Sequence, residues 1–262
     1  MNQPMTYHRP KLSIVLPTYN EAENILELVV RLYQTLSKCD CSFELIVVDD
    51  NSPDNTWKRA EDLSIHYPAV KVFRRMQDHG LVKSINFGLA QAQGDYVAWM
   101  DGDLSHPPEL FATFIKKIFN ENYQAAIASR YVSGGHDSRH SEVFIQRILS
   151  YIICRIGALM MGLKTLDVTS GHIMVEKNIL ANVLPLRGYY GDYFIQMIAD
   201  LENINCKICE VPYVLTNRKR GESKTATSIW GLLLRGRWYV LAILKNLFFM
   251  RSRPGSLSRA KL

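Results

Sequence analysis

Two aspartates separated by one glycine form the segment of this sequence that is best suited to chemistry. Asp101, Gly102 and Asp103 follow the short apolar run 96–100, whose composition is typical of a buried strand. Two carboxylates at the end of a strand can hold a hard divalent cation, Mg²⁺ or Mn²⁺, that carries a phosphate. Gly102 lets a ligand approach the backbone closely. A solvated Asp-Gly turn is the alternative, and the rest of the chain argues against it.

Strands and helices alternate through the first half of the chain. The sequence predicts strands over 12–17, 43–48, 70–73, 96–100 and 125–128. It predicts helices over 24–38, from Asp54 or Thr56 to 67, over 81–93 and over 108–120, the last capped by Ser105 or His106. This alternation is typical of an α/β fold, a mostly parallel sheet with helices on both faces.

Polar groups follow four of the five predicted strands. They lie at 17–21, 49–54, 101–106 and Arg130. In a parallel sheet, ligands bind beyond the carboxyl ends of the strands, so these groups are expected to converge. The glycine patterns of a dinucleotide-binding turn and of a P-loop are both absent, which excludes those two phosphate sites. The convergence favours a site for a cation and a phosphate-bearing ligand.

The second half of the sequence is less regular. It predicts a polar loop over 130–140, an apolar helix or helix pair over 143–162, a turn and strand over 167–175, a helix over 192–201 and a strand over 204–211. Residues 218–224 form a basic, glycine-bearing loop. Such a loop is suited to closing over phosphates, with a solvated linker as the alternative.

The charge of the chain is positive, +6 at neutral pH, and the excess of lysine and arginine lies in the last third. This distribution predicts an anionic surface or phosphate-bearing ligands as partners. Nucleic acid is the competing partner, but no nucleic-acid-binding motif occurs, so we expect none. The paired cysteines at 39/41 and 206/209 are expected to be buried free thiols rather than zinc ligands.

Two apolar stretches, 150–161 and 229–250, are interrupted by basic residues. Neither reaches the roughly 18 uninterrupted apolar residues of a spanning helix. Interfacial helices on a membrane fit better, and a core helix is the alternative. The first residues contain no apolar signal region, so we expect a cytoplasmic protein, peripheral on the cytoplasmic face of a membrane.

Six segments, taken in order, resemble family 2 glycosyltransferases of the GT-A fold, and most closely the dolichyl- or polyprenyl-phosphate mannose synthase group. They are Leu-Pro-Thr-Tyr-Asn-Glu at 16–21, Val-Asp-Asp-Asn-Ser-Pro-Asp-Asn-Thr at 48–56, Met-Asp-Gly-Asp-Leu-Ser-His-Pro-Pro-Glu at 100–109, Ser-Arg-Tyr at 129–131, Asp-Val-Thr-Ser-Gly at 167–171 and Arg-Lys-Arg-Gly-Glu-Ser-Lys at 218–224. Each is weak alone, whereas six in order are specific.

The resemblance implies a role for each matching residue. Asp101 and Asp103 would hold Mg²⁺ or Mn²⁺ on the donor diphosphate, and Arg218 and Lys224 would close over the donor phosphates. The acceptor phosphate would bind Arg130, with Arg147 and Ser150 as further contacts. The nucleotide sugar would be held by Pro17, Tyr19, Glu21, Val48, Asp50 and Gly102, together with Asp103, Arg218 and Lys224. Of these residues, Asp101, Asp103, Arg130, Arg218 and Lys224 are the expected catalytic set.

The implied reaction is inverting transfer of a hexose, most simply mannose from GDP-mannose, to a polyprenyl phosphate at the membrane surface. A UDP-sugar with undecaprenyl phosphate or a polysaccharide as acceptor is the alternative enzyme. A non-catalytic subunit of a membrane glycosylation complex is the alternative from another class. The implied domains are an arm over 1–11, a GT-A domain over 12–224, and an amphipathic membrane-associating helix with a basic tail over 225–262. A membrane-anchoring partner protein is a second way to reach the bilayer.

The chain departs from the pattern of the resembling family at several positions. Ser105 stands where some relatives carry a metal-binding glutamine, and Val82 stands in place of a glycine. His172 and Ile173 replace a phenylalanine and an arginine, and Arg147 lies one position from the expected arginine. These departures bear mainly on the sugar and the acceptor.

Overall fold

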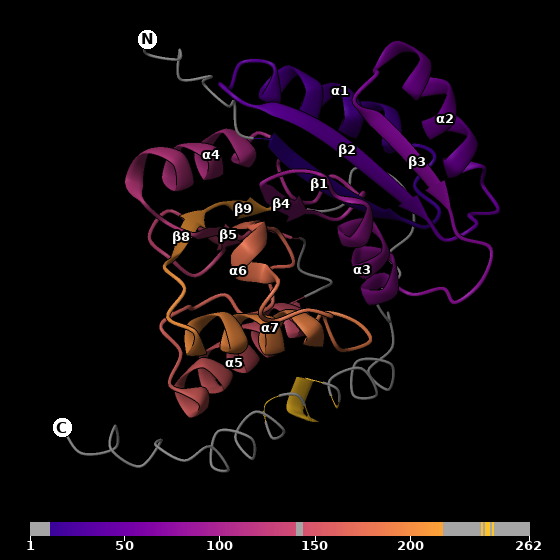
Figure 1. Cartoon of the computed structure of the whole chain (residues 1–262). Helices are drawn as coiled ribbons and strands as arrows, with labels where there is room; N and C mark the ends of the chain where they lie inside the picture. Colours follow the sequence, from indigo (N-terminus) through magenta and orange to yellow (C-terminus); the bar gives the residue numbers. More distant parts are fainter. Residues whose placement is uncertain (1–10, 140–143, 217–236, 238, 242, 244–262) are drawn as a thin grey trace, which may run out of the picture.

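A seven-stranded sheet forms the centre of the molecule (Figure 1). The computed structural model describes residues 11–139, 144–216, 237, 239–241 and 243. The strand order is β3-β2-β1-β4-β7-β5-β8. The strands are β1 (Lys11–Thr18), β2 (Ser42–Asp49), β3 (Val70–Arg74), β4 (Tyr96–Trp99), β5 (Ala125–Ser129), β7 (Ile173–Glu176) and β8 (Ile208–Pro212). The five strands predicted in the first half are therefore confirmed, within two residues at each end.

Helices cover both faces of the sheet, as an α/β pattern predicts. They are α1 (Ile25–Leu36), α2 (Thr56–His66), α3 (Leu81–Gln91), α4 (Leu110–Glu121), α5 (Phe144–Met161), α6 (Lys177–Leu180) and α7 (Asp192–Asn203). One apolar cluster packs α1, α2 and α4 on the sheet, and another packs α3, α5, α6 and α7 on the opposite face. Alternate residues of β1 enter the two clusters: Leu16 joins the first and Val15 the second.

The sheet contains one antiparallel strand, β7, which lies between β4 and β5. The other pairings are parallel. A separate two-stranded sheet joins β6 (His136–Asp137) to β9 (Val214–Leu215). The mostly parallel prediction is confirmed. The sequence did not predict β6 and β9. Each of these strands has two residues, which is too short for an alternation of apolar and polar side chains to be recognised.

The predicted start and cap of one helix are wrong. The helix expected from residue 108 begins at Leu110, because the two prolines and Glu109 form a turn before it. Ser105 and His106 do not cap it, since the side chain of Ser105 hydrogen-bonds to Asp103 instead. The apolar helix over 143–162 is confirmed as one continuous element, α5.

No helix among the described residues combines the length and the apolar character that crossing a bilayer requires. The helix α5 nevertheless exposes a group of large apolar side chains: Ile148, Leu149, Tyr151, Ile152, Ile156, Leu159 and Met160. The expected helix over 225–262 lies almost wholly outside the described residues. The same holds for the expected arm over 1–11, of which only Lys11 is described, as the first residue of β1.

Candidate functional site

The acidic turn after β4 is held in a defined conformation. Oδ1 of Asp103 accepts hydrogen bonds from the backbone N–H and from the hydroxyl of Ser105, at 3.0 and 2.6 Å. Between them, Leu104 has a φ of 60°, a left-handed conformation that a leucine rarely adopts. The Asp103–Ser105 hydrogen bonds and the buried side chain of Leu104 oppose this local strain. Asp103 is buried and Asp101 is partly exposed.

The loop after β1 packs against this turn. A Cβ added to Gly102 would lie 3.4 Å from side-chain atoms of both Thr18 and Glu21. Pro17 and Glu21 are buried, whereas Tyr19 is exposed. Thr56 fixes the loop, because its hydroxyl accepts a hydrogen bond of 2.9 Å from the backbone N–H of Glu21. The predicted nucleotide-sugar residues of β1 therefore adjoin Gly102.

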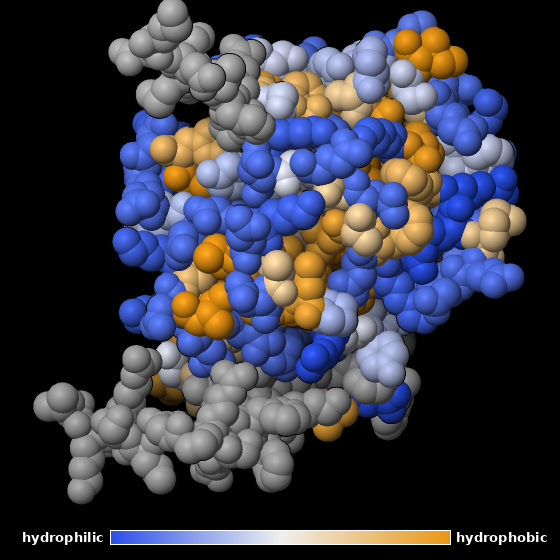
Figure 2. Space-filling model, viewed as in Figure 1, coloured by the Kyte–Doolittle hydropathy of each residue, from blue (hydrophilic) through white to orange (hydrophobic). Residues whose placement is uncertain are grey.

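Asp50, after β2, lies in a buried network that sequence reasoning missed. Its carboxylate accepts hydrogen bonds from Arg75 Nη1 at 3.0 Å, from the Ser84 hydroxyl at 2.7 Å and from the Gly80 N–H at 2.7 Å. These contacts join the loop after β3 to the start of α3, and that loop is hydrophilic in Figure 2. Arg75 gives no short-range sequence signal, because its partner is 25 residues away. The side chain of Val48 lies in the core.

Arg130, after β5, forms a buried ion pair with Asp167. Its Nε and Nη2 donate to the two carboxylate oxygens of Asp167 at 2.8 and 2.7 Å, and Nη2 also donates to the Thr169 hydroxyl at 2.8 Å. Burial opposes the charge on Arg130, but the Asp167 carboxylate raises the pKa of Arg130 well above its usual value. Burial would raise the pKa of Asp167, and Arg130 lowers it. Both groups are therefore ionised.

A pocket of about 300 Å³ opens beside Arg130. The Arg130 pocket, as we call it, is lined by Arg130, Tyr131, His136, Asp137, Arg147, Ile148 and Tyr151. Ser150 adjoins it, because its hydroxyl is 3.3 Å from the Tyr131 hydroxyl. The fold thus brings together the three predicted acceptor-phosphate residues, Arg130, Arg147 and Ser150.

His106 connects the acidic turn with Arg130. Its ring is buried, stacks on Tyr213 and has Nε2 3.0 Å from the Tyr213 hydroxyl. Burial lowers the pKa of His106 to about 4, while the nearby Asp103 carboxylate raises it and the Arg130 guanidinium lowers it. His106 is therefore neutral at pH 7. The backbone N–H of Tyr213 donates to the carbonyl of Ser129 at 3.1 Å, so His106 and Tyr213 link the acidic turn to the residue before Arg130.

The residues of the acidic turn fit a divalent cation. Among the described residues, no group of three or more histidine, cysteine or acidic side chains suited to a metal occurs. The expected donor set is therefore the two carboxylates of Asp101 and Asp103. That set matches the way Mg²⁺ is held by one or two carboxylates, with substrate phosphates and water completing the shell. The hydrogen bonds from Ser105 orient Asp103 for this role.

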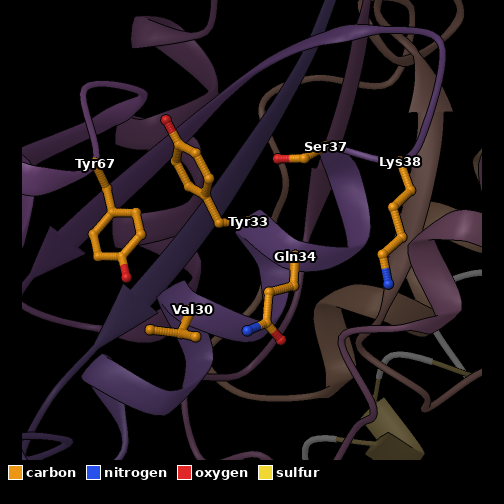
Figure 3. A pocket seen from close by; sticks show the side chains of 6 residues that line it. All are labelled: Val30, Tyr33, Gln34, Ser37, Lys38 and Tyr67. Carbon is orange, nitrogen blue, oxygen red and sulfur yellow. The ribbon is translucent and has the colours of Figure 1, made fainter.

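A larger hollow, about 380 Å³, lies away from this region and is lined by Val30, Tyr33, Gln34, Ser37, Lys38 and Tyr67 (Figure 3). It adjoins the carboxyl ends of α1 and α2. In a parallel α/β unit those ends lie near the amino ends of the strands, opposite the ligand-binding edge. The hollow contains no carboxylate, and we assign it no role in the chemistry. Arg218 and Lys224 lie outside the described residues.

The model of the family described as Glycosyl transferase family 2 matches residues 13–184. The chain belongs to this family. The match spans β1 to α6 and includes the acidic turn, Asp50 and the Arg130 pocket.

Among curated proteins, this chain is similar to two named dolichol-phosphate mannosyltransferases. The one from Pyrococcus furiosus is 38% identical over 222 residues, which cover 82% of this chain and 59% of that protein. The one from Saccharomyces cerevisiae is 29% identical over 83% of this chain and 82% of that protein. An uncharacterised glycosyltransferase of Synechocystis is 28% identical over 65% of this chain and 51% of that protein. The chain thus spans little more than half of the Pyrococcus and Synechocystis relatives.

Solved structures confirm the GT-A-like fold. Glucosyl-3-phosphoglycerate synthase from Mycobacterium tuberculosis, in complex with Mn²⁺, UDP and glucosyl-3-phosphoglycerate, superposes with a TM-score of 0.65. The two chains are 20% identical, and the superposition covers 91% of this chain and 80% of the synthase. The synthase in complex with Mg²⁺ and UDP gives a TM-score of 0.66 at 21% identity.

Proposed function

We propose that this protein transfers a hexose from a nucleotide sugar to a polyprenyl phosphate, with GDP-mannose as the favoured donor and a dolichyl-type phosphate as acceptor. The observation that carries the proposal is the link from the acidic turn to the residue before Arg130 through His106 and Tyr213. A carboxylate pair suits the cation-bound donor diphosphate, and a buried arginine suits the acceptor phosphate. The names of the Pyrococcus and yeast relatives support mannose and dolichyl phosphate.

The proposed chemistry requires no general base. A lipid monophosphate carries about 1.5 to 2 negative charges near neutral pH, so one of its oxygens can attack the anomeric carbon directly. The bond from that oxygen to the sugar forms as the bond from the sugar to the nucleoside diphosphate breaks, with inversion. The diphosphate leaves with the electron pair. The neutral His106 orients Tyr213 rather than moving a proton in this scheme.

Asp101 and Asp103 would hold Mg²⁺ or Mn²⁺, which occurs in the solved structures of the mycobacterial synthase. A bound cation would neutralise charge on the departing diphosphate. The residues of this chain position the two substrates, and positioning is the main catalytic effect when nucleophile and leaving group are already charged. Arg218 and Lys224 would contribute further positive charge over the donor.

The exposed apolar face of α5 supports a peripheral position on a membrane, where the acceptor lipid resides. A membrane-anchoring partner protein and the cytoplasmic face of the membrane remain part of this proposal. The basic residues of the carboxyl-terminal segment would favour anionic lipids.

Transfer of radiolabel from GDP-mannose, and separately from UDP-glucose, to polyprenyl phosphate in liposomes tests the proposal. We expect label in the organic phase from GDP-mannose with Mg²⁺ or Mn²⁺. Asp103→Ala should reduce transfer at least 100-fold, because a metal ligand is lost, while the circular dichroism spectrum stays unchanged. Asp62→Asn, an exposed carboxylate on α2, is the matched control. Label from UDP-glucose alone would show that the donor is UDP-glucose and not GDP-mannose. Full activity of Asp103→Ala would contradict the metal site.

A further inference from the structure

Asp137, in β6, lies among three arginines. Its Oδ1 and Oδ2 accept hydrogen bonds from Arg139 Nε and Nη2 at 2.9 and 2.6 Å. Arg147 Nε lies 3.8 Å from Oδ1, and Arg130 Nη1 lies 3.9 Å from Oδ2. Three guanidinium groups therefore share one carboxylate, and they come from the residue after β5, from the segment after β6 and from α5.

The backbone around Asp137 is pinned on both sides. β6 pairs with β9, with Asp137 opposite Leu215. The N–H groups of His136 and Ser138 donate to the carbonyls of Tyr213 and Leu215 at 3.1 and 2.9 Å. The carboxylate itself is 8% exposed, and the Arg139 and Arg130 charges lower its pKa against the opposing effect of burial. Asp137 is thus an ionised group whose backbone is held by pairing with β9.

We propose that Asp137 is the positioning residue of the acceptor-phosphate site, because it joins Arg130 and Arg147, which line the Arg130 pocket, to the neighbouring Arg139. The inference rests on the proposed function and adds to it Arg139 and Asp137, which the sequence did not indicate. Three guanidinium groups within 4 Å of one point repel one another unless an anion lies between them. Asp137 provides that anion between the three arginines, while Asp167 holds the other side of Arg130 and the Arg139 carbonyl accepts from Arg147 Nη1 at 3.1 Å.

The charges in this cluster favour a phosphomonoester as the ligand. Arg130, Arg139 and Arg147 contribute three positive charges, and Asp137 and Asp167 contribute two negative charges. The balance among these five described side chains is therefore +1. A bound phosphate, which carries about 1.5 to 2 negative charges, changes the net charge of the cluster from slightly positive to slightly negative. The phosphate oxygens also match the forked donors of arginine. Ile148 and Tyr151 line the same pocket and offer apolar contact to a prenyl chain.

The test uses the full chain and farnesyl phosphate, a short soluble prenyl phosphate, in isothermal titration calorimetry. We expect Asp137→Asn to raise the dissociation constant for farnesyl phosphate about tenfold. The dissociation constant for GDP in the presence of Mn²⁺ should stay within twofold of the wild-type value. Asp137→Glu, which keeps the charge, should return the farnesyl phosphate constant to within threefold of wild type. In transfer assays, Asp137→Asn should raise the acceptor KM about tenfold with kcat within twofold. Asp62→Asn, another aspartate paired with a basic side chain, is the control.

Unchanged acceptor affinity in Asp137→Asn would overturn the inference. Tighter binding would overturn it as well, since Asp137 would then compete with the phosphate. Equal losses for farnesyl phosphate and GDP would show a general structural role. If Asp137→Asn does not fold, Arg139→Gln tests the same cluster and should give the same tenfold loss. If the wild type binds farnesyl phosphate yet transfers no sugar, the proposed function fails and the binding data still decide on Asp137.

Discussion

Ser105 fixes the carboxylate of Asp103, the residue that we propose as a metal ligand. Asp103 Oδ1 receives both the backbone and the hydroxyl hydrogen bond of Ser105, which fixes the direction of the carboxylate. Some relatives carry a metal-binding glutamine at this position, according to the resemblance described above. In this chain a short hydroxyl that orients Asp103 would take the place of that direct contact. Residues that hydrogen-bond to a metal ligand generally affect the metal affinity, so Ser105 should do so at the proposed site.

Ser105→Ala removes the hydroxyl hydrogen bond and keeps the backbone one. Loss of such an outer contact typically costs 10- to 100-fold in metal affinity, so we expect the Mn²⁺ concentration for half-maximal transfer to rise about tenfold. Electron paramagnetic resonance of Mn²⁺ with GDP measures the same shift without turnover. Ser64→Ala, on the exposed part of α2, is the control. An unchanged Mn²⁺ titration would show that Ser105 does not orient the ligand.

His172 is a buried histidine at a position where the resembling family carries a phenylalanine. Its ring is fully buried among Phe111, Phe114 and His106, and neither ring nitrogen has a hydrogen-bond partner within the described part of the chain. The resembling family carries a phenylalanine here, which explains the aromatic surroundings. Burial, with a smaller effect from His106, lowers the pKa of His172 well below its usual value, so the ring stays neutral.

His172→Phe should therefore stabilise the fold by about 1 kcal/mol at pH 7, because unpaired buried nitrogens cost about 1–3 kcal/mol and the larger ring offsets part of that gain. The pH dependence has a definite sign. The unfolded histidine protonates near pH 6.5 and the folded one does not, so stability is present above that pH and is lost as the pH falls below it. Urea unfolding at pH 7 and pH 5 should show a smaller loss for His172→Phe than for wild type. An equal loss would contradict this assignment.

The loop after β3 and the start of α3 are joined through one buried carboxylate. The Asp50 carboxylate accepts hydrogen bonds from Arg75, Ser84 and Gly80. It therefore ties the end of β2 to the end of β3 and to the start of α3. Both members of the Asp50–Arg75 pair are less than 10% exposed. A buried ion pair contributes little net stability, but removal of one partner leaves the other uncompensated.

Arg75→Met should lower the free energy of unfolding by about 3 kcal/mol, because a buried carboxylate loses its counter-charge. The double variant Asp50→Asn/Arg75→Met should lose less than the sum of the single variants, since it leaves no buried charge. Guanidinium denaturation of the four proteins measures this cycle. Additive losses would show that the two residues act independently. Arg74→Met, which removes a neighbouring surface arginine stacked on Trp57, is the control.

The elements that sequence reasoning found and missed differ in the range of the interactions that define them. Strands β1 to β5 and their helices follow from short apolar runs and helical spacing, which are local signals. The position of β7 between β4 and β5 depends on pairing across more than 40 residues, which no local pattern contains. The acidic turn was found because its residues are contiguous. Arg75 and Tyr213 were missed because their partners lie 25 and 107 residues away in the chain. Asp137 was missed although its arginine partners are near in sequence, because it lies in a polar segment that was predicted as a loop.

At the scale of the whole molecule, α5 connects the Arg130 pocket with an exposed apolar surface. Arg147, Ile148 and Tyr151 of α5 line the pocket. Further along the helix, Ile156 and Leu159 are exposed, Leu159 to 82%. A helix that binds the acceptor headgroup at one end and a bilayer along its side would keep the lipid chain in the membrane during transfer. The basic residues of the last third would add attraction to anionic lipids.

Leu159→Gln tests this arrangement with no change of charge. Insertion of one leucine into the interface contributes about 1.5–3 kcal/mol, so its loss should reduce partition onto vesicles at least tenfold. Flotation with vesicles that contain anionic lipid measures the partition. Ile65→Gln is matched closely, because Ile65 is 74% exposed and lies in the last turn of α2, on the opposite face of the sheet. The two variants should have equal melting temperatures and differ only in vesicle binding. Equal partition of both would show that α5 does not contact the bilayer, and the acceptor lipid would then have to leave the membrane to reach Arg130.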